Sequence, residues 1–534
     1  MTTLASRKTE DILQAEYNAV PYHSFSFSHT HPAHLFTLAK LFALTPTPIE
    51  KARVLELGCA SGGNLIPMAF RFPHASFLGI DLAEKQIDEG VKQITDLKLN
   101  NIELRHQSIV NFTEKEGKFD YIICHGVYSW VDDHVKEKIL QICRENLTSN
   151  GVAYVSYNTL PGWNMINSIR ELMAWHTKNI QDPPTKALQA RSVLKFISDG
   201  LHDDKSPYAE VLRSEINLLS KQSDNYLLHD HLSSFNQPIY FYQFIERANA
   251  QNLSYLSDAF LPTMFTGNLP ANLSNELNKI NNIIIIGQYM DFVRNQRFRC
   301  TLLCHQDNQV NRSLRTKDIE NFYLQMMGKP QDPNFSAAQI QEGKEIHFTY
   351  SNITLTVRNA ISQLAMLILC EEQAKPIHYN ALCEKIASRG TLKDIAAIKN
   401  LLNDDLNLMR MAFAGLINIK SYCENYLMQV PEKPYVCPLI RYQGQRQNHV
   451  TNQRHEPIAL EPLVKVLLPY LDGTNTIESL INITKKHVAE GLLLVLDENK
   501  QQIKDKEESD KRIALFCRQA LENMAKQALL SEPT

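Results

Sequence analysis

Two carboxylates and three glycines stand close together in one stretch of this 534-residue chain. Glu56 is followed by Gly58, then by Gly62 and Gly63, and Asp81 comes further along. Glycine lets the backbone approach a ligand at a distance where a Cβ atom would clash. A carboxylate at the end of a strand can accept hydrogen bonds from both hydroxyls of a ribose. These residue types in this order indicate a site for a nucleoside cofactor.

The apolar pattern around these residues predicts the elements that hold them. Val54, Leu55 and Leu57 form a run too short for a helix, which is typical of a buried parallel strand. A helical pattern follows the glycines at residues 64–72, and a second strand over residues 76–80 ends at Asp81. Because ligands bind outside the carboxyl ends of parallel strands, we expect the glycines and Asp81 to meet at one edge of an open α/β sheet.

The glycine spacing distinguishes between cofactors. A dinucleotide-binding turn uses G-x-G-x-x-G, with bare amides against a pyrophosphate, whereas the spacing from Gly58 here is G-x-x-x-G-G. Glu56 would repel a pyrophosphate but suits a ligand that carries an ammonium and a sulfonium. Residues 56–64, Glu-Leu-Gly-Cys-Ala-Ser-Gly-Gly-Asn, resemble the first motif of the class I S-adenosylmethionine-dependent methyltransferases. A dinucleotide enzyme is the weaker alternative.

Strand and helix patterns continue to alternate after Asp81. They place a helix at 84–98, strands at 102–106 and 120–124, a helix at 132–147 and a fifth strand at 151–157. Such spacings need right-handed crossovers and predict a doubly wound, Rossmann-like α/β sheet. The chain then becomes mainly helical, which predicts appended helical domains. An aromatic loop before the first strand, residues 21–32, is well placed to fold over a cofactor.

Four separated motifs narrow the resemblance. Residues 17–22, 30–32, 157–163 and 291–305 resemble those of bacterial methyltransferases that carry a methyltransferase-regulatory domain. Some members of that group are similar to lysine methyltransferases of bacterial outer-membrane proteins, which are homodimers with further domains. The resemblance therefore implies a protein-lysine N-methyltransferase that acts on a bacterial surface or outer-membrane protein, with a polypeptide as substrate and a homodimer as its assembly. Methylation of a small molecule, and a non-catalytic cofactor-sensing regulatory protein, remain alternatives.

Length and pattern suggest four parts. We predict an S-adenosylmethionine-binding domain at 1–165, a regulatory or dimerisation domain at 166–310, a middle domain at 311–440 and a small helical domain at 455–534, with a polar linker at 443–455. The helices and strand expected between residues 359 and 422 are compatible with a winged-helix-like module.

Composition argues against several partners. The net charge of −3 gives no domain-wide basic field for nucleic acid. Ten scattered cysteines without a C-x-x-C motif are typical of reduced thiols in the cytoplasm. The polar N-terminus and the lack of any run near about 18 apolar residues predict no membrane insertion. The four histidines at 23, 29, 31 and 34 lack a strong ligand spacing, so we expect no metal.

The predicted site residues fall into two groups. The cofactor S-adenosyl-L-methionine is expected to contact Tyr22, Glu56, Gly58, Ser61, Gly63, Asp81, Leu82, Gln107, Ser108, Ile109, His125, Gly126 and Val127. Glu56 would hold its ammonium, Asp81 its ribose, and residues 82 and 107–109 its adenine.

The acceptor amine is expected to lie among aromatic and polar groups that follow the fourth and fifth strands. These residues are His125, Tyr128, Tyr157, Asn158 and Trp163, with Trp130 and Tyr22 beside them. Burial there would lower the pKa of an amine. His125 is a candidate general base. The Asn/Asp-Pro-Pro-Tyr motif expected for amide or nucleobase acceptors is absent after the fourth strand.

Overall fold

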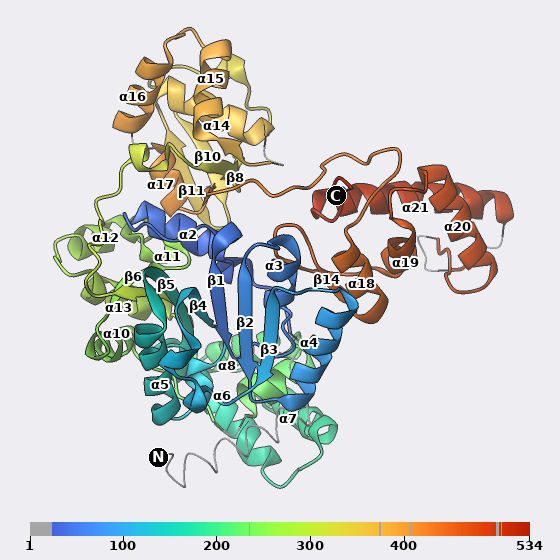
Figure 1. Cartoon of the computed structure of the whole chain (residues 1–534), viewed down its shortest axis with the longest axis horizontal. Coiled ribbons are helices and arrows are strands. Elements are labelled where there is room, and N and C mark those ends of the chain that lie inside the picture. The colour runs from blue at the N-terminus through green and yellow to red at the C-terminus, as the bar shows by residue number, and fades with distance from the viewer. Residues whose placement is uncertain are drawn as a thin grey trace.

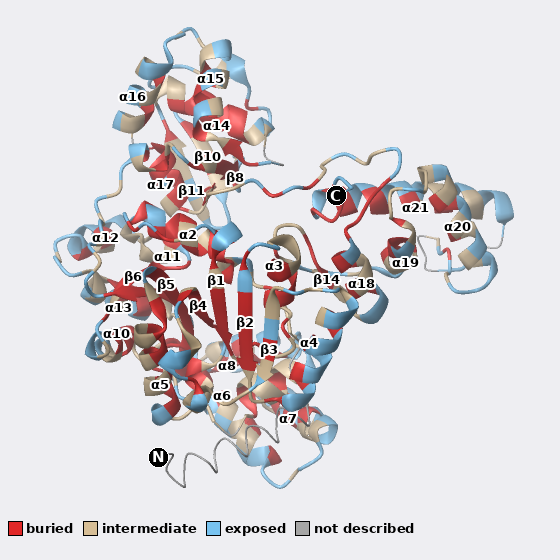
Figure 2. Cartoon of the chain, in the orientation of Figure 1, coloured by how far each residue is buried: buried red, intermediate tan, exposed pale blue. Residues whose placement is uncertain are grey.

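A computed structural model describes residues 24–233, 235–372, 375–405, 407–497, 501–503 and 505–533 of the chain. A body built around one large sheet occupies the centre, with a middle domain beyond α2 (Pro32–Leu41) and a C-terminal domain beyond α4 (Glu84–Asp96) (Figure 1). Figure 2 shows that buried residues follow the central strands, while the outer helices expose much of their surface.

The described residues of the body form a seven-stranded sheet in the order β3-β2-β1-β4-β5-β7-β6. Strands β1 to β5 are parallel, and β7 runs antiparallel to both of its neighbours. The bounds are β1 Arg53–Leu57, β2 Ser76–Asp81, β3 Ile102–His106, β4 Phe119–Cys124, β5 Leu147–Asn158, β6 Leu253–Asp258 and β7 Phe298–His305. This arrangement confirms the predicted Rossmann-like sheet.

Helices cover both faces of the sheet because successive strand residues point to opposite sides. Val54 and Ile123 join the core beneath α2, α3 (Leu65–Arg71) and α4. Leu55 and Ile122, one position away, join the core beneath α5 (Asp133–Glu145) and α10 (Phe241–Ala250).

The sheet extends beyond the boundary predicted at residue 165. Strands β6 and β7 come from the segment assigned to the regulatory domain, so the division at 165 cuts through the sheet. The helices of this segment are α6 Gly162–Thr177, α7 Pro183–Gly200, α8 Pro207–Ser220, α9 Asp224–Tyr226, α11 Leu261–Met264, α12 Ala271–Leu277 and α13 Ile283–Arg294, and a π-helical turn spans Leu227–His231. Helices α6, α7 and α8 share a small core of their own.

A buried arginine ties the added strands to the helices. Arg299 on β7 donates from Nη1 to both oxygens of Asp258 (3.0 and 2.8 Å) and from Nε to both oxygens of Asp291 (3.1 and 2.9 Å). Its Nη2 donates to the Gly287 carbonyl (3.1 Å), and the guanidinium lies over the ring of Phe241 at 3.7 Å. One side chain therefore joins β6, β7, α10 and α13.

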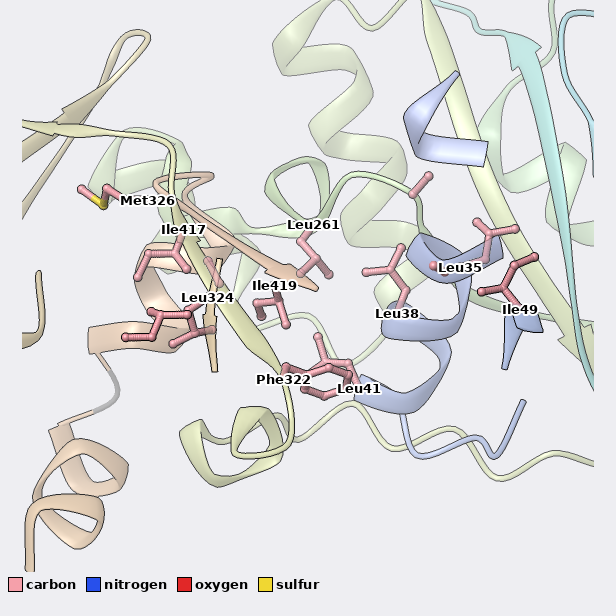
Figure 3. Packing of buried hydrophobic residues seen from close by; sticks show 14 of the residues in the cluster. Leu35, Leu38, Leu41, Ile49, Leu261, Phe322, Leu324, Met326, Ile417 and Ile419 are labelled. Carbon is pink, nitrogen blue, oxygen red and sulfur yellow. The ribbon is translucent and has the colours of Figure 1, made fainter. Parts of the chain in front are cut away.

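The middle domain packs on the body through α2. Leu38 and Leu41 of α2 lie in one buried cluster with Phe322 and Ile419 (Figure 3). The domain comprises β8 Tyr323–Met326, β9 Lys329–Pro330, β10 Ile346–Tyr350, β11 Ile353–Val357, α14 Ala360–Glu371, β12 Ile377–His378, α15 Tyr379–Arg389, α16 Ile395–Asp405, α17 Asn407–Phe413 and β13 Ile417–Lys420.

The segment predicted as a polar linker is structured instead. Residues 443–455 contain the end of α18 and the whole of β14, and His455 is only 2% exposed. The polar side chains misled the prediction because they make hydrogen bonds within and between domains. The C-terminal elements are α18 Pro438–Arg446, β14 His449–Thr451, β15 Pro457–Ala459, α19 Pro462–Leu467, α20 Ile477–Ala489 and α21 Lys506–Lys526. Among the described residues, no helix combines the length and apolar character that a membrane crossing requires.

Replacing Arg299 with Leu should lower the free energy of unfolding by about 3–5 kcal/mol, because two buried carboxylates lose their cation. Urea unfolding followed by tryptophan fluorescence measures this, since all three tryptophans lie at positions 130, 163 and 175 in the body. Lys195→Ala, which breaks the exposed Lys195–Asp199 pair, should cost under about 1 kcal/mol. Equal effects of the two substitutions would contradict a structural role for the arginine cluster.

Candidate active site

A cavity of about 430 Å³ opens at the carboxyl edge of the parallel strands. Its wall includes Glu56 near the end of β1, Gly58 just after β1, Asp81 at the end of β2, His125 after β4 and Asn158 at the end of β5. The volume lies within the range of small-molecule and cofactor sites. The strand ends thus bring the predicted residues together at the predicted edge.

The turn after β1 requires glycine at its first position. Gly58 has φ +78°, and a Cβ atom there would lie 2.4 Å from Cγ2 of Val127. Backbone without a side chain therefore forms this part of the wall, as the sequence predicts.

Glu56 presents a carboxylate oxygen that has no protein partner. The residue is 4% exposed, and its Oε1 accepts a hydrogen bond from Nδ2 of Asn64 at 2.8 Å. Among the described residues, nothing donates to its Oε2. Burial, aided by the charge of Asp81 and opposed by the Asn64 hydrogen bond, raises the pKa of Glu56 to about 8. A buried acceptor on the wall of a cavity fits a cationic group of a ligand.

Asp81 keeps acceptor capacity for hydroxyl groups. Its Oδ2 accepts from the Ala60 amide and its Oδ1 from the Ala83 amide, both at 2.8 Å. An ionised carboxylate offers about four lone-pair sites, so further donors can bind. Burial raises the pKa of Asp81, while hydrogen bonds from backbone amides act in the opposite direction. Leu82, Gln107, Ser108 and Ile109 line the same end of the cavity.

Ser61 and Gly63 do not line the cavity, contrary to the sequence prediction. The Gly63 amide donates to Oγ of Ser24 at 2.8 Å, and a Cβ atom at position 63 would lie 2.2 Å from the Ser24 carbonyl oxygen. The segment before α2 therefore covers this part of the glycine turn. From this segment, the cavity wall gains Ser24, Phe25 and Phe27 in place of Ser61 and Gly63. The predicted contact Tyr22 lies outside the described residues.

His125 stands beside Gly126 and Val127, which also line the cavity. Its Nδ1 lies 2.9 Å from the hydroxyl of Tyr154, and its ring packs on Phe27 at 4.2 Å. Burial lowers the pKa of His125 to about 4, so the ring is neutral near pH 7.

Two predicted acceptor residues, Tyr128 and Tyr157, lie in the core and not on the cavity wall. Tyr157 stacks on Phe244 at 4.1 Å and its hydroxyl pairs with Thr301 at 2.9 Å, while Tyr128 meets Phe244 edge-on at 5.2 Å. Strand alternation explains the error for Tyr157, because Asn158 at the end of β5 reaches the cavity and Tyr157 beside it faces α10. Both tyrosines are at most 1% exposed.

The other predicted acceptor residues do line the cavity. Trp163 and Trp130 face each other edge-on, with ring centroids 6.4 Å apart, and Trp163 also stacks on His231 at 5.9 Å. Asn158 donates from Nδ2 to Oδ1 of Asn236 at 3.0 Å. The loop after β4 and the start of α6 thus place two tryptophan rings on this part of the cavity wall.

Residues from the appended helices complete this end of the cavity, and sequence reasoning did not assign them to the site. Glu215, which forms an ion pair with Arg297, and Asp230 both line it. Among the described residues, Oδ2 of Asp230 has no hydrogen-bond partner, and burial raises the pKa of this residue to about 7. The sequence feature that could have pointed to these residues is the polar stretch at 229–231 between helical patterns. No local pattern shows that this stretch lies beside the strand ends in the folded protein.

Family comparisons agree with this architecture. A methyltransferase domain model matches residues 54–151, a predicted methyltransferase regulatory domain matches 223–305, and the PKMT C-terminal winged helix domain matches 432–529. We expected a winged-helix-like module within residues 311–440, whereas the winged-helix match begins at residue 432 and so lies almost wholly in the C-terminal domain.

Individual relatives cover nearly the whole chain. An uncharacterized protein of Rickettsia prowazekii is 38% identical over 520 residues, which are 96% of this chain and 93% of the relative. The structure of PKMT2 from Rickettsia typhi, solved in complex with AdoHcy, is 36% identical with a TM-score of 0.86, and the match covers 96% of this chain and 100% of that one. PKMT2 without that ligand gives a TM-score of 0.85.

The strand-end cavity, the methyltransferase domain match and the full-length likeness lead to one conclusion: this chain belongs to the PKMT family of S-adenosylmethionine-dependent methyltransferases.

Proposed function

We propose that this enzyme methylates lysine side chains of a polypeptide, with a bacterial surface or outer-membrane protein as the substrate. The observation that supports the proposal most strongly is the cavity's two-part wall. One part consists of strand ends suited to the cofactor. The other consists of tryptophans and a buried carboxylate oxygen that has no hydrogen-bond partner within the described ranges of the chain. The full-length likeness to PKMT2 supports a protein acceptor.

The residues at the strand ends fit S-adenosylmethionine. Oε2 of Glu56 would accept from the ammonium, Asp81 would accept from the ribose hydroxyls, and Leu82, Gln107, Ser108 and Ile109 would enclose the adenine. When bound, the cofactor supplies a methyl group on a sulfonium, already activated for in-line displacement. The protein then has to orient the acceptor and exclude water.

A lysine acceptor must lose a proton before it can attack. Its ordinary pKa near 10.4 makes the free amine cost roughly 4.6 kcal/mol at pH 7. The Trp130 and Trp163 rings can hold the ammonium as it enters and lower its pKa by excluding water. Asp230 would then take the proton on its unpartnered Oδ2, since its pKa of about 7 suits a general base near neutral pH.

His125 fits a positioning role better than the general-base role suggested by the sequence. With a pKa of about 4 it is a weak proton acceptor at neutral pH. Its hydrogen bond to Tyr154 and its contact with the ring of Phe27 instead fix a neutral ring at the cavity wall. The amide of Asn158 can orient the acceptor nitrogen from the end of the neighbouring strand β5.

We also propose a cytoplasmic homodimer. Each of the ten cysteines, all of which the structure describes, has a free thiol, which supports a reducing compartment. A dimer is supported by the outer face of α13, where Ile285, Tyr289, Phe292 and Val293 are each between 46% and 53% exposed. These positions follow helical spacing and form one apolar stripe.

Incubation of the protein with methyl-labelled S-adenosylmethionine and a bacterial lysate should place label in polypeptides, recovered as methyl-lysine after hydrolysis. Asp230→Asn should lower kcat/KM at least about ten-fold, the scale of a lost general base, without changing the affinity for S-adenosylhomocysteine. Asp203→Asn, at an exposed position, is the matched control. Label recovered only in small molecules or nucleic acid would contradict the proposed acceptor.

The affinity for S-adenosylhomocysteine should rise with pH, because Glu56 must ionise to pair with the ligand's ammonium. Below its free-enzyme pKa of about 8, each unit of falling pH should weaken binding by up to about ten-fold. Calorimetry at about pH 6, 7 and 8 measures the slope. Glu56→Gln should bind more weakly and show a smaller pH dependence, because a proton on residue 56 is no longer linked to binding. Parallel pH curves for the two proteins would refute the assignment.

A further inference from the structure

The C-terminal domain contacts the cofactor end of the cavity through the side chain of His455. This residue is 2% exposed, and its Nε2 lies 2.8 Å from Oδ1 of Asn64. Because an amide oxygen only accepts, Nε2 is the donor. Asn64 lines the cavity and donates from Nδ2 to Glu56 at 2.8 Å. A two-bond path therefore runs from the winged-helix domain to the carboxylate expected to hold the cofactor ammonium.

The segment that carries His455, residues 451–455, is also anchored at the C-terminal end of α3. Arg71, the last residue of that helix, donates from Nη2 to the carbonyls of Thr451 (3.2 Å) and Asn452 (2.5 Å) and from Nε to Oε1 of Gln453 (3.2 Å). Residues 451–455 therefore lie along α3 from its C-terminal end to the residue that precedes its first turn. The position of His455 opposite Asn64 follows from this docking.

The turn that presents His455 is itself held by side chains. Oδ1 of Asn452 accepts from the amides of Arg454 and Glu456, both at 2.9 Å, and Nδ2 of Asn452 donates to the Gln527 carbonyl at 2.9 Å. His455 has φ +60°, a conformation that costs energy for a residue with a Cβ atom. A strained residue held so firmly points to a function that the surrounding structure maintains.

Asn64 also holds the cover of the cavity. Its Oδ1 accepts from the Phe27 amide at 3.1 Å, and its Nδ2 donates to Oγ1 of Thr30 at 2.9 Å. Phe27 lines the cavity and its ring packs against His125. The side-chain amide of Asn64 thus holds both Glu56 and the N-terminal segment, and His455 in turn holds this amide.

We propose that His455 is a positioning residue for cofactor binding, through which docking of the C-terminal domain on α3 orders Asn64, Glu56 and the cavity cover. The inference rests on the proposed binding of the cofactor ammonium by Glu56. Since coupling between two binding events is reciprocal, cofactor should also strengthen the docking of the C-terminal domain.

Calorimetry of the full-length protein with S-adenosylhomocysteine tests this inference. His455→Ala should raise Kd about five- to 150-fold, the usual range for coupled sites. His455→Gln should restore most of the affinity, since its amide nitrogen can reach Asn64, and His455→Asn should not, because its side chain is shorter. In turnover assays the Ala variant should raise KM for the cofactor and leave kcat within about two-fold. His487→Ala, on α20 of the same domain, is the control and should bind like the wild type.

The outcomes separate the two proposals. Wild-type protein that does not bind S-adenosylhomocysteine would overturn the cofactor site itself. Wild-type binding with an unchanged Kd in the Ala variant would overturn only the role of His455. Should the Ala variant fail to fold, the Gln and Asn variants decide, and equal affinities for these two would also overturn the inference.

Discussion

The hydrogen bond between Asn64 and Glu56 is the interaction on which the site depends. It gives one oxygen of a buried carboxylate a donor, while the other has none among the residues that the structure describes. An unpaired buried acceptor costs free energy until a ligand meets it. Asn64 is held in this position by hydrogen bonds from the N-terminal segment and from His455, so Glu56 stays oriented in spite of this cost. The cofactor site is therefore assembled by three parts of the chain that are far apart in sequence.

The two ends of the cavity differ in how they are built. The cofactor end consists of residues at the carboxyl ends of parallel strands, where a twisted open sheet provides a crevice. The acceptor end takes Glu215 and Asp230 from helices of the appended segment, which also supplies β6 and β7 and locks them with Arg299. In the proposed function, the sheet supplies cofactor binding and the added helices line the path of the acceptor.

Sequence reasoning predicted that Glu56, Gly58 and Asp81 lie together at one edge of the sheet because the signals for this placement are local. Glu56, Gly58 and Asp81 belong to strand–turn–helix units whose patterns span only a few residues, so their common edge follows from topology. Tyr128 and Tyr157 were misplaced because aromatic type alone does not show which face of a strand or turn is buried. Asp230 and His455 were missed because their roles depend on contacts with residues far away in the chain. A polar, aperiodic stretch such as 443–455 resembles a linker until its partners are known.

A crystal structure of the protein with S-adenosylhomocysteine tests the central claim most directly. The predicted complex has the ligand's amino group within about 2.7–3.2 Å of Oε2 of Glu56 and its ribose hydroxyls at the same distance from Asp81. In that complex Asn64 should keep its hydrogen bonds to Glu56 and His455. A ligand whose amino group lies away from Glu56, or a cavity that stays empty at saturating ligand, would contradict this description of the site.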